Sequence, residues 1–366
     1  VGGIVAGTNT TTADYALNSV QGASGTLAST ARTDISNLDF ASTDNTGITG
    51  SAITMTGNAT TAEGSANRVS NALSASATDN GATAGLNNSQ ASDADVTVNA
   101  VSTVGTTLAG AGIVVAATNS SISVDGNSTT ALARGKSASN ALNYNDTSYS
   151  GPTTLAAITD TTSVAAAISM RNGQTNSGAL NATSTGAAYN VSLDAAATVA
   201  AGALNSSAKL ANNTVAANGF GNVASNALDA TTSGAAAPSV GLLNDQANSG
   251  GVTTLANGAT FTLALNSDGI GATNSSAVMT NNTVSSNAYG NMATNNVAMA
   301  AFGAGVPSSA VSSVQSNSAA ISATAANVTF GMTVGSNTGS ALRSNGNNTT
   351  VQAVANSSVS TIGGGN

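Results

Sequence analysis

The stretch NNTVAANGFGNVASNAL, at residues 212–228, decides the fold because it recurs along the chain. Its relatives are GNATTAEGSANRVSNAL at 57–73, GNSTTALARGKSASNAL at 126–142 and NNTVSSNAYGNMATNNV at 281–297. In every copy a leading asparagine is followed by a second one 13 positions later. The pairs are Asn58 and Asn71, Asn127 and Asn140, Asn213 and Asn226, and Asn282 and Asn295. Self-similarity at a fixed spacing indicates a repeat architecture.

Glutamine provides a second marker of the repeat. Five of the six glutamines stand 33 to 39 residues before a leading asparagine: Gln21, Gln90, Gln174, Gln246 and Gln315. They divide a single elongated repeat domain, residues 1–366, into units at about 21–89, 90–173, 174–245, 246–314 and 315–366. The step from the second asparagine to the next glutamine is 34 residues in one unit and 19 or 20 in the others, and Pro152, Pro238 and Pro307 each follow a second asparagine by 12 residues. These offsets predict an insertion within 153–173.

A third marker, Asn-Ser-Ser, begins at Asn119, Asn205 and Asn274, eight residues before the leading asparagine. It divides the 69 residues between Asn213 and Asn282 into steps of about 21, 20 and 28. Such steps are typical of single coils of a β-solenoid. The sequence therefore predicts three coils per unit, about 15 coils in all, and a length of roughly 70 Å at about 4.8 Å per coil.

Apolar residues alternate with small or polar ones after four of the five glutamines, which predicts strands with one buried face. The alternating sets are Ser36/Leu38/Phe40, Tyr189/Val191/Leu193, Phe261/Leu263/Leu265 and Phe330/Met332/Val334. In the Gln90 unit this position holds Gly105, Thr107 and Ala109, and Ile113 and Val115 are expected to take over. Alanine-rich 194–203 has helix-forming composition, but the alternation favours an all-β fold.

Stacked coils explain why amides recur at fixed places. When coils lie about 4.8 Å apart, an inward asparagine or glutamine can hydrogen-bond to the same residue above and below, which satisfies a buried polar group. The marker asparagines and glutamines are therefore predicted to form ladders, with serine in supporting positions. The alternative is that these residues are ordinary turn formers, and the constant spacing in four copies favours the ladder.

Composition excludes several classes of function. Lys and Arg number 7 against 15 Asp and Glu, the net charge is -8, and cysteine, histidine and tryptophan are absent. Seven scattered cations cannot neutralise a nucleic acid, and no stretch approaches the roughly 20 apolar residues of a membrane helix. The only lysines are Lys136 and Lys209, and an isolated acidic pair, Asp93 and Asp95, is typical of a solvated strand face. We expect no enzyme activity, no cofactor, no metal, no nucleic acid partner and no membrane span.

The segment Gly219-Phe220-Gly221-Asn222-Val223-Ala224 resembles the G-x-G-x-x-N-x-A rhythm of curlin repeats, and residues 288–293 are a looser copy. The spacing of asparagine and glutamine is similar to that of Fap-type fibre proteins and of the repetitive holdfast-anchor proteins of stalked bacteria. The resemblance implies secretion in an unfolded form, assembly outside the cell into β-rich fibres, and a role in attachment or biofilm matrix.

The sequence thus predicts a structural subunit of an extracellular filament, with its own copies as partners and with a processed N-terminus, since the chain begins at Val1. After Asp268 the only charged residue is Arg343, so the C-terminal unit is expected to act as a joint by strand addition. One alternative is a monomeric or trimeric surface adhesin or spike stalk, with the insertion near Tyr144 and Tyr149 as a projecting loop. Another is a surface-layer lattice protein.

Overall fold

The computed structural model describes residues 3–5, 10–42, 48–78, 81–112, 115–151, 156–158, 163–197, 201–234, 236–265, 272–303 and 307–365. All regular secondary structure in these residues is β-strand. Accordingly, the described part of the chain holds no helix of the length and apolarity that crossing a membrane requires.

Five sheets of parallel strands make up most of the structure. The first consists, in spatial order, of β3 (Tyr15–Ala23), β8 (Ala84–Ser92), β15 (Ile168–Asn176), β21 (Ser239–Asn248) and β27 (Ser308–Asn317). The second contains β4 (Thr26–Ser42), β9 (Asp95–Gly112), β16 (Leu180–Thr185), β17 (Ala188–Ala197), β22 (Val252–Asn257), β23 (Thr260–Leu265), β28 (Ile321–Ala326) and β29 (Thr329–Val334). The third contains the short strands β5 (Ile48–Thr49), β10 (Val115–Thr118), β18 (Ala201–Leu204), β24 (Ala272–Thr273) and β30 (Asn337–Thr338).

The two remaining parallel sheets complete the return path of the chain. The fourth comprises β6 (Ala52–Thr56), β11 (Ser121–Asp125), β19 (Ser207–Ala211), β25 (Ser276–Thr280) and β31 (Ala341–Asn345). The fifth comprises the long strands β7 (Ala59–Ala77), β12 (Ser128–Asp146), β20 (Thr214–Gly234), β26 (Thr283–Gly303) and β32 (Asn348–Gly365). Among the described strands, each of these sheets is open at both ends.

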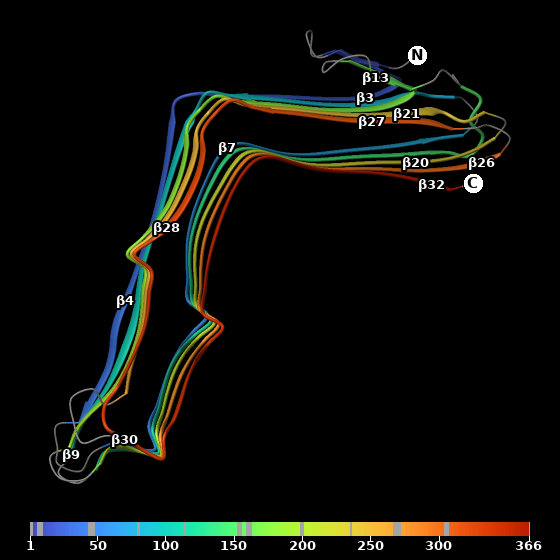
Figure 1. Cartoon of the computed structure of the whole chain (residues 1–366). Helices are drawn as coiled ribbons and strands as arrows, with labels where there is room; N and C mark the ends of the chain where they lie inside the picture. Colours follow the sequence, from blue (N-terminus) through green and yellow to red (C-terminus); the bar gives the residue numbers. More distant parts are fainter. Residues whose placement is uncertain are drawn as a thin grey trace.

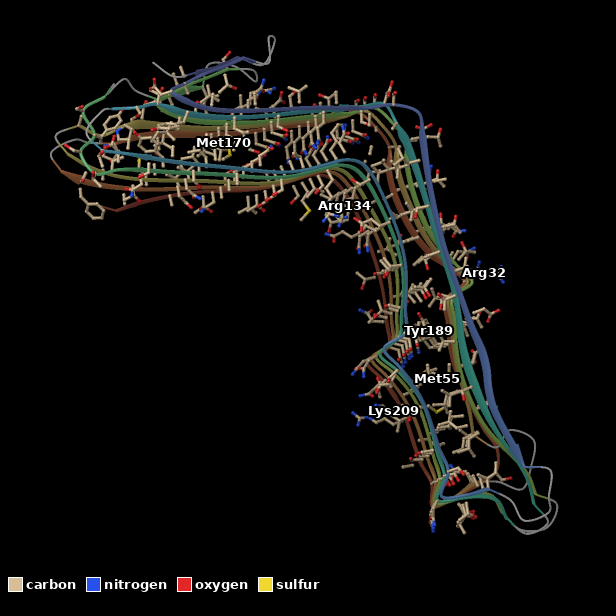
Figure 2. All side chains as sticks on the ribbon, turned by 180° about the vertical axis from the view of Figure 1, so that it is seen from behind. Arg32, Met55, Arg134, Met170, Tyr189 and Lys209 are labelled. Carbon is tan, nitrogen blue, oxygen red and sulfur yellow. The ribbon has the colours of Figure 1, made fainter. Side chains whose placement is uncertain are left out.

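The chain passes through the sheets in the same order five times, and each pass forms one flat layer. Layer 1 contains β3–β7, layer 2 β8–β12, layer 3 β15–β20, layer 4 β21–β26 and layer 5 β27–β32. Each layer is bent into an L (Figure 1). The upper arm of the L contains β21 and the lower arm ends near β30. Along both arms the first two sheets form the outer limb of the L, and the last two sheets form the inner limb. Side chains such as Met170, Met55 and Tyr189 fill the space between the limbs (Figure 2).

One repeat unit therefore makes one layer, and the prediction of three coils per unit is wrong. Partners in the fifth sheet are a whole unit apart: Ala59 pairs with Ser128, which pairs with Thr214, giving offsets of 69 and 86 residues. The steps of 20 to 28 residues between sequence markers are successive limbs of a single broad L. With five layers about 4.8 Å apart, the first and last strands of a sheet are about 19 Å apart, instead of the expected 70 Å.

Asparagine and glycine shape the bends of the inner limb. The asparagine of each Asn-Ser-Ser marker (Asn119, Asn205 and Asn274) has φ between 49° and 51°, and Gly50 and Gly339 occupy the corresponding bend in layers 1 and 5 with φ of 65° and 67°. Glycine and asparagine are the residues that adopt this left-handed conformation at least cost. A second column of glycine or asparagine, at positive φ in every layer, separates the fourth and fifth sheets.

The alternating strands lie in the second sheet, and where their side chains are described the apolar face points inward. Tyr189, Val191 and Leu193 are buried and pair with Phe261, Leu263 and Leu265 of the next layer. The prediction that Ile113 and Val115 take over this position in layer 2 is wrong as far as the described residues show. Val104 is the residue that pairs with Tyr189, and Val115 belongs to β10 in the third sheet. The bend between β16 and β17 has no counterpart in β9, so layer 2 is one residue shorter there. Ile113 lies outside the described residues.

The interior is apolar at the two ends of the L and polar near its corner. One apolar cluster fills the lower arm and contains Tyr189, Phe261 and their neighbours. A second cluster, of valines and alanines such as Val96 and Val98, lies nearer the corner. A third fills the tip of the upper arm around Leu86 and Met170. The buried second asparagines and marker glutamines lie in the upper arm between the second and third clusters, whereas the leading asparagines are buried in the lower arm, at the second bend of the inner limb.

The predicted insertion contains two short strands. β13 (Ala157–Ile158) and β14 (Ser163–Ala165) form an antiparallel sheet with β1 (Gly3–Val5) and β2 (Thr10–Thr12). This sheet packs on the outer face of the first parallel sheet, where glycine allows close approach: a Cβ on Gly241 would lie 2.6 Å from Val164 Cγ1. Tyr144 and Tyr149, expected near a projecting loop, are buried. Pro238 and Pro307 directly precede β21 and β27, and Pro152 lies outside the described residues.

Candidate functional site: amide ladders and two open faces

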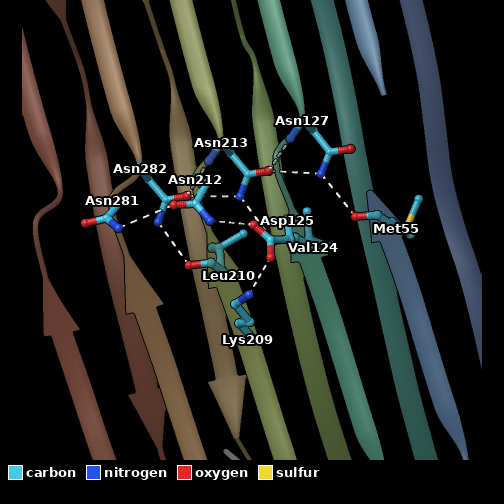
Figure 3. Close-up of polar contacts among 10 residues, drawn as sticks. All are labelled: Met55, Val124, Asp125, Asn127, Lys209, Leu210, Asn212, Asn213, Asn281 and Asn282. Carbon is cyan, nitrogen blue, oxygen red and sulfur yellow. Dashed lines mark hydrogen bonds and ion pairs between the residues drawn. The ribbon is translucent and has the colours of Figure 1, made fainter. Parts of the chain in front are cut away.

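The leading asparagines form a hydrogen-bonded ladder through the layers at the second bend of the inner limb, and Figure 3 shows its central members, Asn127, Asn213 and Asn282. Asn58 Nδ2 donates to Asn127 Oδ1 at 2.8 Å, Asn127 Nδ2 to Asn213 Oδ1 at 2.9 Å, and Asn213 Nδ2 to Asn282 Oδ1 at 3.0 Å. In layer 5 the ladder residue is Asn347, one position before the Asn348 indicated by the 33-residue step from Gln315: Asn282 Nδ2 donates to Asn347 Oδ1 at 2.9 Å. Each Oδ1 also accepts the backbone N–H of the asparagine in the preceding layer. One side chain therefore satisfies both a buried amide and the backbone of the bend.

The second asparagines form another ladder in the upper arm. Asn71 donates to Asn140, Asn140 to Asn226 and Asn226 to Asn295, each at 2.8 Å. In layer 5 Ser360 takes the place of the asparagine and accepts from Asn295 at 3.2 Å. The ladder also bonds across the interior to asparagines of the first sheet, for example from Asn140 Nδ2 to Asn172 Oδ1 at 3.1 Å, so it links the two limbs as well as the layers.

The marker glutamines form a third ladder, whose donors point the opposite way along the stack. Gln90 Nε2 donates to Gln21 Oε1, Gln174 to Gln90, Gln246 to Gln174 and Gln315 to Gln246, at 2.7 to 2.9 Å. Each Nε2 also donates to a backbone carbonyl of the inner limb; for Gln174 this is Val223 O at 3.0 Å. The structure thus brings together all thirteen asparagines and glutamines that the sequence singled out.

Further ladders were not predicted, although the sequence shows them by their fixed spacing from the marker residues. Asn176, Asn248 and Asn317 form one, and each stands two residues after a marker glutamine. Another column stands nine residues after the leading asparagines and consists of Asn67, Lys136, Asn222, Asn291 and Asn356. Serine Oγ atoms of the Asn-Ser-Ser markers form a shorter ladder to backbone N–H groups, as from Ser120 N to Ser206 Oγ at 3.2 Å.

Lys136 interrupts an asparagine column in layer 2. Its side chain is fully buried, and within the described residues neither its Nζ nor Asn222 Oδ1 in the next layer has a hydrogen-bond partner. Burial lowers the pKa of Lys136 to about 7, an effect that the charge of Asp93 partly opposes. Lys209, the other lysine, lies on the concave side of the L and forms an ion pair with Asp125.

Among the described residues no group of three or more His, Cys, Asp or Glu side chains is placed to hold a metal ion. The two members of the acidic pair, Asp93 and Asp95, have different contacts. Asp95 Oδ1 accepts the backbone N–H of Ala179 in the next layer at 2.8 Å, and Asp93 is the charged group that acts on Lys136.

The stack ends in two open faces. The layer-1 face is the outer edge of β3–β7, and the layer-5 face is the outer edge of β27–β32; these strands are the terminal members of their sheets among the described strands. Large apolar side chains are exposed on the layer-5 face, including Leu342 at 46% and Ile362 at 52%. Exposed strand edges with few charges are surfaces to which further strands add.

These features define an all-β protein of stacked parallel layers tied together by amide ladders. Comparison with family models, with curated proteins and with solved structures finds no match for the chain.

Proposed function

We propose that this chain is a structural, non-catalytic subunit of an extracellular filament or surface fibre, and that its fold is a β-solenoid whose layers continue from one copy to the next. The observation that carries the proposal is the pair of open faces. Each face offers the free edges of its described strands in all five parallel sheets, so a second copy can extend every parallel sheet at once.

The amide ladders support the same proposal. Within the chain they make each layer a template for the next, because an asparagine or glutamine at a fixed place satisfies its counterpart. Stacked, in-register amides of this kind are a recognised source of stability in cross-β fibres. The proposed extracellular location and the role in attachment or biofilm matrix rest on composition and on the resemblance to fibre proteins of bacterial surfaces.

Electron microscopy of the purified chain tests the proposal. We expect unbranched filaments, with a diffraction spacing of about 4.8 Å along the filament axis because the strands lie across it. A variant with lysine at inward positions on both faces (Leu17→Lys, Leu73→Lys, Leu342→Lys and Ile362→Lys) is expected to stay monomeric, because polymerisation would bury the added charges. Val20→Lys and Val359→Lys, whose side chains lie on outward-facing columns, are the matched controls and should still polymerise.

Other outcomes would contradict the proposal. Two-dimensional sheets would indicate a surface-layer lattice protein, and discrete particles at every concentration would indicate an adhesin stalk or another monomeric role. Filaments that persist in the variant with lysine on both faces would show that the copies join elsewhere.

A further inference from the structure

We infer that copies of this chain join head to tail in a single register, with the layer-5 face of one copy on the layer-1 face of the next. This inference rests on the proposed function and specifies the partner surface, the pairing of residues and the polarity of the filament.

The first argument is the direction of the ladders. In the leading-asparagine ladder, layer n donates both Nδ2 and backbone N–H to Oδ1 of layer n+1. The layer-5 face therefore carries donors at Asn347, whose Nδ2 bonds to Ser344 Oγ at 3.2 Å in place of a next-layer amide. The layer-1 face carries the matching acceptor, Asn58 Oδ1. A second copy in register would continue the ladder from Asn347 to Asn58.

The glutamine ladder supports the same register, although its hydrogen-bond donors point in the opposite direction along the stack. Layer n+1 donates to layer n, so Gln21 on the layer-1 face provides the donor and Gln315 on the layer-5 face provides Oε1 as the acceptor. Among the described residues, Gln21 Nε2 has only a long contact of 3.5 Å to Arg68 O. Head-to-tail stacking satisfies the ends of both ladders in a single step. Two identical faces cannot do this, because each would bring donor to donor in one ladder and acceptor to acceptor in the other.

The second argument is the match of apolar columns. The pairing of neighbouring strands places residues of the five layers in columns, and each column sets a residue of layer 5 over a residue of layer 1 of the next copy. The inward-facing pairs are Val311 on Leu17, Ile321 on Leu27, Leu342 on Ile53 and Ile362 on Leu73. All four contacts are aliphatic. Leu342 and Ile362 are exposed by 46% and 52%, and their removal from water favours the joint.

The third argument is the outline of the L. Its arms are unequal: in layer 1 the outer limb has nine residues in β3 and 17 in β4. Rotation by 180° about an axis in the plane of a layer would either lay a short arm over a long one or turn one arm away, and both arrangements leave strands uncovered. A head-to-tail joint superposes the whole outline, and such heterologous joints continue without closure when successive copies are related by translation.

Complementation of two blocked variants tests the polarity. Variant A carries Leu17→Lys and Leu73→Lys on the layer-1 face, and variant B carries Leu342→Lys and Ile362→Lys on the layer-5 face. Alone, each should remain monomeric by light scattering, because its one intact face meets only blocked counterparts. An equimolar mixture should form a heterodimer of one A and one B. Homodimers of A or of B, or a mixture that stays monomeric while the unmodified chain forms filaments, would overturn the inference and leave the filament proposal standing.

Cysteine cross-linking tests the register in the unmodified geometry. The chain has no cysteine of its own, and Val20 and Val314 lie in the same outward-facing column. A Val20→Cys/Val314→Cys variant should therefore form intermolecular disulfides on oxidation and give a ladder of multimers on denaturing gels, since facing Cα atoms lie within disulfide range. The control Val20→Cys/Ser312→Cys, two residues out of register, should give little cross-linking. Equal cross-linking of both variants would overturn the proposed register, and an absence of filaments and of cross-links alike would overturn the filament proposal with it.

Discussion

Replacement of Lys136 by asparagine should stabilise the protein at neutral and acidic pH. Lys136 occupies a column that is asparagine in the other four layers, and its buried ammonium has no hydrogen-bond partner among the described residues. Its pKa falls from 10.5 to about 7 because burial disfavours the charged form. At about 1.4 kcal/mol per pKa unit, this shift corresponds to a cost of about 5 kcal/mol when the lysine is protonated in both the folded and unfolded states.

The direction of the pH dependence follows from proton counting. Between pH 7 and pH 10.5 the unfolded chain holds a proton on Lys136 that the folded chain has lost. Stability rises with pH wherever the unfolded state binds more protons. The free energy of unfolding should therefore increase by up to about 5 kcal/mol across this window, and below pH 7 the full cost of the buried charge remains.

Urea unfolding followed by circular dichroism measures this effect. We expect Lys136→Asn to remove the rise between pH 7 and pH 10.5 and to raise the free energy of unfolding at pH 7 by about 5 kcal/mol, with about 1 kcal/mol more if the new amide donates to Asn222 Oδ1. The control Lys209→Asn removes a lysine that is 45% exposed and should leave the rise intact. If the unmodified chain is equally stable across this window, or if Lys136→Asn destabilises it, then Lys136 is not buried as a charge in the folded state.

Three further substitutions test the packing of the layers, each by its effect on the free energy of unfolding measured in urea. Asn140→Ala should cost about 2–3 kcal/mol because it leaves buried amides without partners, whereas Asn143→Ala, at an exposed position on the same strand, should change stability by less than about 0.5 kcal/mol; equal effects would contradict the ladder. Gly221→Ala should cost about 1–3 kcal/mol because its Cβ would lie 2.3 Å from a carbonyl oxygen of the next layer, and Gly22→Ala, with open space around it, should be tolerated. Phe261→Ala should cost about 3–5 kcal/mol because its ring stacks on aromatic rings of both adjacent layers, with centroids 5.0 and 5.3 Å apart; a loss below about 1 kcal/mol would show that these rings do not share a packed core.

The sequence predicts the ladders better than the path of the chain. Constant spacing identifies which residues are equivalent, and equivalent polar residues in stacked strands have each other as hydrogen-bond partners, so the ladder from Asn58 to Asn282 follows from the repeat alone. Spacing does not give the number of turns that separate two equivalents. An Asn-Ser-Ser marker suits the end of a short coil and a bend in a long limb equally, because in both cases its asparagine adopts positive φ.

The sequence also did not indicate that the column containing Lys136 faces the interior. Lys136 aligns with Asn67 and Asn222 by spacing, but a lysine in a polar repeat is normally solvated. Only the bend of the L, which carries the fifth sheet around the corner, places this column in the interior.

Identical columns stabilise the stack but do not by themselves determine the order of its layers, because any layer with the same amides would fit any other. The exceptions in the columns distinguish one neighbour from another. Lys136 occurs only in layer 2, and Arg171 occurs only in layer 3, where it is buried and donates to Asn87 of layer 2 at 3.3 Å. A layer that slips by one unit would separate Arg171 from Asn87 of layer 2 and from the charge of Asp245 in layer 4, and an unpaired buried charge costs several kcal/mol. The interior layers therefore carry the residues that define their order, while layers 1 and 5 expose the repeated amides and aliphatic side chains that a further copy can match.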